Sequence, residues 1–171
     1  MCRLVLMLAL LAPGWAAAQE PGARPADVAS AEAILAAVYD AISGPAGAPR
    51  DWARFRSLFA ADARLIPTTR VPEGWMPRTQ TVEEWIQAAD GWFRENAFYE
   101  EEIARVVETY GHVTHAFSTY VSRRAPGAEP FARGINSIQL FHDGARWWVV
   151  TIMWDHEANA GPVPERYLPR R

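Results

Sequence analysis

The chain has 171 residues, of which half are hydrophobic, and a formal net charge of −3 at pH 7. This small charge, without a basic cluster, argues against a nucleic-acid-binding protein. The single cysteine, Cys2, falls in an N-terminal segment that we expect to be removed, so disulfides, a thiol nucleophile and a cysteine-ligated metal are excluded. The remaining ~150 residues suffice for one domain with a sizeable core.

Residues 1–18 have the features of a secretory signal peptide. Arg3 supplies a positive charge, a short apolar run follows, and Ala16-Ala17-Ala18 offers small residues for cleavage. The apolar run is too short to span a bilayer. We therefore expect a periplasmic or secreted protein whose mature chain begins near Gln19, with a flexible leader over residues 19–27.

Three helices are predicted in the first half of the chain. Residues 28–43 carry apolar side chains at helical spacing. Asp51 can cap a second helix. The sequence Thr81-Val82-Glu83-Glu84 is a capping box and begins a third helix, which ends near Asn96.

The second half of the chain reads as long strands. A short strand over residues 63–69 comes first, and strands over 99–109 and 112–123 follow the third helix. Residues 133–157 form a hairpin, because Asp143-Gly144 joins two apolar, β-rich runs. This order predicts an α+β fold, with three N-terminal helices packed on one face of a curved antiparallel sheet.

The turns at Tyr110-Gly111 and Asp143-Gly144, taken as two-residue turns, set the register of these strands. With a symmetric loop between the middle strands, one polar row then crosses an otherwise apolar face of the sheet: Glu102, Thr119, Asn136 and Thr151. Such a row can orient a ligand in a small-molecule pocket. It can equally be a network of structural hydrogen bonds, because buried polar groups need partners.

The other face of the same hairpin is predicted to be apolar. Because side chains alternate along a strand, Trp148, Ile152 and Trp154 share this face, away from the helices. An apolar stripe of this kind predicts a homodimer packed sheet to sheet.

Glu102 is the only carboxylate in the predicted polar row. A buried carboxyl suits general acid/base work. Its neighbours Glu100 and Glu101 are equally consistent with a solvated, acidic strand end.

Three other side chains are candidates for the same site. His115 and Asp155 are predicted on the face of the polar row, although a surface histidine and a salt bridge from Asp155 to a nearby arginine remain open. Trp92 could line a pocket or belong to the core. His112 falls on the opposite face from His115, so no metal site is expected, and no motif indicates a cofactor.

Several segments carry a family resemblance: ILAAVYDAISG, WARFRSLFAADARLIP, HAFSTYVSRR, RGINSIQL and DGARWWVVTIMWDHE. With these, the chain resembles uncharacterised secreted members of the nuclear transport factor 2-like superfamily, which includes SnoaL-like polyketide cyclases and ketosteroid isomerase. The resemblance implies a cone-shaped α+β barrel over residues 28–157, often dimeric, with a pocket between sheet and helices. Residues 158–171 would then form a C-terminal coil tail.

The resemblance does not extend to the residues that catalyse the isomerase reaction. Tyr39 occupies a place comparable with the oxyanion-binding tyrosine of ketosteroid isomerases, but Pro67 falls where the resemblance places their general base. Their oxyanion aspartate falls near Asn136 or Ser137. Two function classes stay open. One is a non-catalytic protein that binds a small, apolar molecule. The other is a cofactor-free isomerase, lyase or hydrolase that uses acid/base residues in an apolar pocket.

Overall fold

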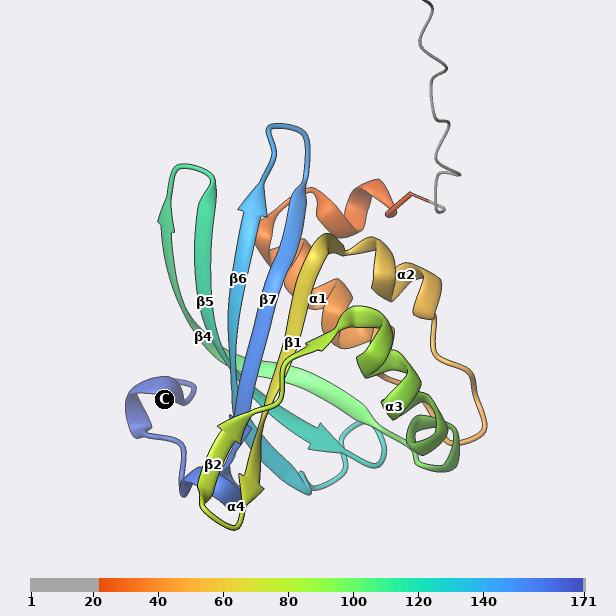
Figure 1. Ribbon diagram of the computed structural model, residues 1–171, viewed down its shortest axis with the longest axis vertical. Helices are drawn as coiled ribbons and strands as arrows, with labels where there is room; N and C mark the ends of the chain where they lie inside the picture. Colours follow the sequence, from red (N-terminus) through yellow and green to blue (C-terminus); the bar gives the residue numbers. More distant parts are fainter. Residues whose placement is uncertain (1–21, 171) are drawn as a thin grey trace, which may run out of the picture.

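A computed structural model describes residues 22–170, and the expected signal peptide lies outside this range. The chain forms a curved, unclosed sheet with the helices α1, α2 and α3 on one face, as Figure 1 shows. The predicted α+β fold is confirmed. No helix in the described part of the chain is long and apolar enough to cross a membrane.

The first helical elements are a 3-10 helix, η1 (Pro25–Val28), and two α-helices, α1 (Ala31–Ile42) and α2 (Trp52–Ser57). The side chain of Asp51 accepts a hydrogen bond from the Arg54 backbone N–H at 3.0 Å, so the predicted cap of α2 is confirmed.

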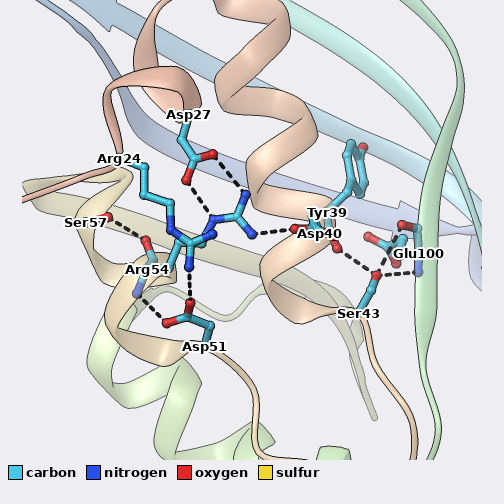
Figure 2. A network of polar contacts seen from close by, with 9 residues as sticks. All are labelled: Arg24, Asp27, Tyr39, Asp40, Ser43, Asp51, Arg54, Ser57 and Glu100. Atoms are coloured by element: carbon cyan, nitrogen blue, oxygen red, sulfur yellow. Dashed lines mark hydrogen bonds and ion pairs between the residues drawn. The ribbon is translucent and has the colours of Figure 1, made fainter.

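Arg54 on α2 forms ion pairs with residues of η1 and α1. Its guanidinium binds Asp27 at 2.7 Å and also Asp40, as Figure 2 shows. Because Asp27 is buried in this ion pair, the second half of the predicted leader is an ordered turn of helix rather than a flexible segment.

Helix α3 (Val82–Glu95) begins at the predicted capping box. The Thr81 hydroxyl accepts a hydrogen bond from the Glu84 N–H at 3.2 Å, and the Glu84 carboxylate accepts one from the Thr81 N–H at 2.8 Å. The helix buries Ile86 and Phe93 against the sheet.

The main sheet has the strand order β2-β1-β7-β6-β5-β4, and β3 pairs with β1. The strands are β1 (Phe59–Val71), β2 (Gly74–Pro77), β3 (Gln80–Thr81), β4 (Tyr99–Tyr110), β5 (Val113–Arg123), β6 (Ala132–His142) and β7 (Trp147–His156). Strand β1 is longer than predicted and pairs with β7 in parallel, so the sheet is mixed rather than wholly antiparallel.

The β6–β7 turn is longer than the two residues predicted. The Asp143 carboxylate accepts hydrogen bonds from the N–H groups of Ala145 and Arg146 at 2.7 and 2.8 Å, which closes a four-residue loop. His142 therefore pairs with Trp147.

A bulge shifts the register again between the pairs Leu140–Val149 and Gln139–Thr151. Beyond it, side-chain parity along β7 is reversed. Asn136 pairs with Trp154 rather than with Thr151.

The bulge overturns the predicted apolar stripe. Ile152 and Trp154 face the helices, where Ile152 belongs to the core, while Thr151 points to the other face. Of the three stripe residues, Trp148 alone lies on the face away from the helices, opposite Phe141.

Two smaller register shifts affect β5. The β4–β5 turn is formed by Gly111 and His112, so that Tyr110 pairs with Val113. Across the β5–β6 loop, Asn136 pairs with Ser118 instead of Thr119. Thr119 therefore points away from the helices.

The C-terminal segment crosses the sheet face opposite the helices (Figure 1). Within the predicted C-terminal tail, residues 158–171, it contains two short helical turns, α4 (Glu157–Ala160) and the 3-10 helix η2 (Glu165–Tyr167), joined by coil. The buried Thr119 hydroxyl donates a hydrogen bond to the Tyr167 carbonyl at 2.7 Å, and the Tyr167 ring packs edge-on against Phe117.

Candidate functional site

The space between the sheet and the helices contains a cavity of about 130 Å³, which we call the cone cavity. It is mostly apolar, with aromatic rings from α2, α3 and β7 and from Phe98, which precedes β4. The lining side chains are Val38, Ile42, Phe55, Leu65, Trp85, Phe93, Phe98, Ile152 and Trp154, together with the polar residues Glu100, Tyr120 and Asn136.

Glu100 is the acidic group of the cone cavity. Its backbone N–H donates to the Ser43 hydroxyl at 3.0 Å, which ties β4 to the end of α1 (Figure 2). Although Glu100 lies on the edge strand and is half-buried as a residue, its carboxyl is desolvated. Burial raises the pKa of Glu100 to about 7, against the opposing effect of hydrogen bonds from Ser122 and Asn136. The carboxyl is therefore protonated in a large fraction of molecules at neutral pH.

Tyr120 is a second polar residue that lines the cone cavity. The residue is only 5% exposed, yet its hydroxyl has no hydrogen-bond partner within residues 22–170. Its ring packs over Gly134 on the paired strand, where an added Cβ would approach the Tyr120 oxygen to 2.6 Å. Burial and the nearby Glu100 charge raise the pKa of Tyr120, so its hydroxyl stays a neutral donor.

A chain of hydrogen bonds runs beside the cavity. The Asn136 amide donates to the Tyr39 hydroxyl at 3.0 Å, and the Tyr39 and Ser118 oxygens lie 2.7 Å apart. Ser118 donates to the Glu102 carboxylate, which also pairs with Arg105 at 2.6 Å. Since Ser118 gives its proton to Glu102, Tyr39 must donate to Ser118.

This chain is a structural network, because each member already has its partner. Burial raises the pKa of Tyr39, which keeps the phenol protonated and the direction of the chain fixed. Glu100 lines both the cone cavity and a groove of about 380 Å³ at the edge of β4, and Tyr39 and Glu102 of the network also line this groove.

The structure brings together three of the residues selected from the sequence: Tyr39, Glu102 and Asn136. Four others lie on the opposite face of the sheet, contrary to prediction: His115, Thr119, Thr151 and Asp155. The register shifts described above cause all four errors. His115 Nε2 lies 3.1 Å from the Ser137 hydroxyl on that outer face.

Trp92 also lies outside the cone cavity. Its side chain is 42% exposed on α3, and the Arg124 guanidinium stacks over its ring at 5.2 Å. The salt bridge from Asp155 to a nearby arginine is absent among residues 22–170, where Arg54 pairs with Asp27 and Arg133 with Glu157.

Sequence reasoning missed Glu100, Ser118 and Tyr120. Alternation along β4 places Glu100 on the same face as Glu102, so strand parity was an available signal. Ser118 and Tyr120 were displaced by the one-residue register error in β5. Within residues 22–170, no three His, Cys, Asp or Glu side chains are grouped to hold a metal ion.

Comparison with known proteins identifies the fold. No family model matches the chain, and neither does any curated protein. Among solved structures, a nuclear transport factor 2-like protein of unknown function from Pseudomonas putida aligns with a TM-score of 0.56 at 12% identity, covering 81% of this chain and 94% of that one. A protein of unknown function with a cystatin-like fold from Nostoc punctiforme aligns with a TM-score of 0.55 at 12% identity, covering 74% and 92%.

A third similar structure is a nuclear transport factor 2-like protein of unknown function from Silicibacter pomeroyi. Its TM-score is 0.51 at 13% identity, with 75% of this chain and 93% of that one covered. The chain therefore has the nuclear transport factor 2-like fold that the resemblance predicted. At these identities the likeness extends to the fold alone.

Proposed function

We propose that this protein binds a compact, mainly apolar molecule in the cone cavity and that no catalytic step is required. One observation carries the proposal: an apolar cavity contains a protonatable carboxyl, Glu100, and an unpartnered hydroxyl, Tyr120, on the same wall. A hydroxyl that lines an apolar cavity and has no protein partner is available to a ligand that accepts a hydrogen bond there.

The cavity volume limits the ligand. An engineered, dry cavity of ~150 Å³ in another protein holds one benzene ring. The cone cavity, at about 130 Å³, accordingly suits a single small ring or a short branched chain. Because Glu100 and Tyr120 both donate hydrogen bonds near neutral pH, the ligand should carry one neutral acceptor, such as a carbonyl oxygen.

The proposal is tested by titrating the protein with cyclopentanone and with cyclopentane, followed by amide NMR. We expect cyclopentanone to bind more tightly and to shift the amides of Glu100, Tyr120 and Asn136. Tyr120→Phe should weaken cyclopentanone binding about tenfold, which is the value of one good hydrogen bond in a dry site. Tyr110→Phe is the matched control, because Tyr110 is 92% exposed. Equal affinity for both probes, or equal effects of both variants, would contradict the proposal.

An acid–base enzyme is the second candidate, and the pKa of Glu100 near 7 favours it. A general acid/base should act close to its pKa, and Glu100 is the only carboxylate that lines the cone cavity. Glu100→Gln separates the two candidates. It would keep most ligand binding but abolish exchange of the α-protons of bound cyclopentanone with deuterated solvent if the site is catalytic. No exchange in the unaltered protein would favour simple binding.

We also propose export and self-association. Export rests on residues 1–18 and is tested by the intact mass of protein recovered from the periplasm or the medium. Self-association rests on the outer sheet face near the β6–β7 loop, where Val113 and Phe141 pair across strands and are 54% and 41% exposed. A second copy packed on this outer row would bury both side chains.

A further inference from the structure

The outer face of the sheet carries a second cavity, separate from the cone cavity. It measures about 430 Å³ and lies between the sheet and the arch of the C-terminal segment, and we call it the arch pocket. The sheet contributes Phe117, Ile135, Ser137, Met153 and Asp155, while the arch contributes Pro162, Val163 and Pro164.

The arch is anchored at both ends. At its start, the Glu157 carboxylate accepts a hydrogen bond from the Val163 N–H at 2.9 Å and lies 3.5 Å from Arg133. At its end, Tyr167 is held by the buried Thr119 hydroxyl and by its ring contact with Phe117. Between these anchors, Gly161 at φ 81° and two prolines keep the chain clear of the sheet. The pocket is thus built by tertiary contacts that fix its roof.

The polar end of the arch pocket has an anionic group. One oxygen of Asp155 accepts hydrogen bonds from the His156 N–H at 2.8 Å and the Asn159 amide at 3.0 Å. Partial burial alone would raise the pKa of Asp155, but these bonds and the Thr68 hydroxyl hold it below the ordinary value. No salt bridge to Asp155 is present in the described part of the chain, so its charge is not neutralised by an arginine.

A buried hydroxyl lies beside this carboxylate. Thr68 on β1 lines the pocket with its hydroxyl toward Asp155, and its oxygen accepts no hydrogen bond from any described residue. Glu157 is balanced by Arg133, so the net charge of the lining is negative. A carboxylate, a hydroxyl oxygen and an aromatic ring at Phe117 together form an environment that attracts an organic cation.

We propose that the arch pocket binds a small organic ammonium ion, with the cationic nitrogen at Asp155 and Thr68 and an apolar body against Phe117 and Met153. A volume of about 430 Å³ falls within the range of small-molecule pockets and admits a substituted ring. The arch pocket contains neither Glu100 nor Tyr120, and Trp154 is the one residue that lines both cavities.

The proposal is tested with 2-phenylethylamine, which is cationic at pH 7, and with the neutral analogue 2-phenylethanol. Binding to the full mature chain is followed by amide NMR at a fixed salt concentration. We expect the amine to bind at least about tenfold more tightly than the alcohol, because only the amine pairs with the carboxylate. The shifted amides should include Ile135, Met153 and Val163, and exclude Tyr39 and Glu100.

Asp155→Asn should weaken amine binding about tenfold and leave alcohol binding unchanged, since asparagine keeps an oxygen for His156 and Asn159 but loses the charge. Asp62→Asn, an exposed position on β1, is the matched control. The proposal is overturned if the amine and the alcohol bind equally, if the amine shifts only cone-cavity amides, or if a second copy of the chain covers the pocket. In the last case the same amides would shift with protein concentration and not with amine.

Discussion

The two faces of the sheet differ in how the polar side chains beside them are used. On the helix face, Tyr39, Ser118 and Glu102 satisfy one another, while Glu100 and Tyr120 line a small, mostly apolar cavity. On the outer face, Asp155 and Thr68 line a larger pocket under the C-terminal segment. Consecutive residues of one strand therefore serve two different sites, and a one-residue shift of register would exchange them.

The largest expected effect concerns the outer row of Val113 and Phe141. Phe141→Glu would bury an unpaired charge in the proposed dimer contact and weaken association by several kcal/mol. Sedimentation velocity should show the variant as a monomer and the unaltered chain as a dimer at micromolar concentration. Thr69→Glu, on β1 away from this row, serves as the control. A monomeric unaltered chain would refute the assembly.

The second prediction concerns how stability depends on pH through two acidic groups, Glu100 on the helix face and Asp155 on the outer face. Folding raises the pKa of Glu100 from 4.5 to about 7, so the folded state holds this proton more tightly than the unfolded chain. Its contribution to stability is complete below pH 4.5 and is lost as the pH rises to 7, a change of about 3 kcal/mol.

Glu100→Gln removes this proton linkage, so the free energy of unfolding of the variant should depend less on pH between 4.5 and 7. Urea denaturation of both proteins at several pH values measures the difference. Asp155→Asn should leave the profile between pH 4.5 and 7 unchanged, because folding lowers the pKa of Asp155 below its ordinary value of 3.8, so that its stabilisation is lost only in more acidic solution. Identical profiles for the unaltered chain and Glu100→Gln would contradict the desolvated carboxyl.

The smallest expected effect is the difference in stability loss between substitutions at Asn136 and Ser137, which lie on opposite faces of β6. Asn136→Leu removes the donor to Tyr39 and should lower the free energy of unfolding by about 1–3 kcal/mol. Ser137→Leu alters the half-buried outer face and should cost less than ~1 kcal/mol. Chemical denaturation measures both. A larger loss from Ser137→Leu would show that the parity of β6 is reversed.

The fold could be predicted because its signals are local. The capping box at Thr81, the helix cap at Asp51 and the apolar periodicity of α1 are all present in the structure. Their hydrogen bonds join residues close in sequence, so the sequence alone defines them.

The candidate site was less predictable because it depends on register. The Asp143 carboxylate extends the β6–β7 turn to four residues, and a bulge after Val149 then reverses the parity of β7. Asn136 and Glu102 were placed on the correct face, whereas Thr151 and Asp155 were not. The arch over the outer face also escaped prediction, because Thr119 anchors it across 48 residues of sequence.

The most direct test of ligand binding in the cone cavity is titration of the Glu100 carboxyl by carbon-13 NMR, with the signal assigned by Glu100→Gln. We expect a midpoint near pH 7, and a further rise when cyclopentanone occupies the cone cavity and accepts a hydrogen bond from the protonated carboxyl. A midpoint near the ordinary value of 4.5, unchanged by the ligand, would show that water reaches Glu100 freely and would contradict a dry, ligand-binding cavity.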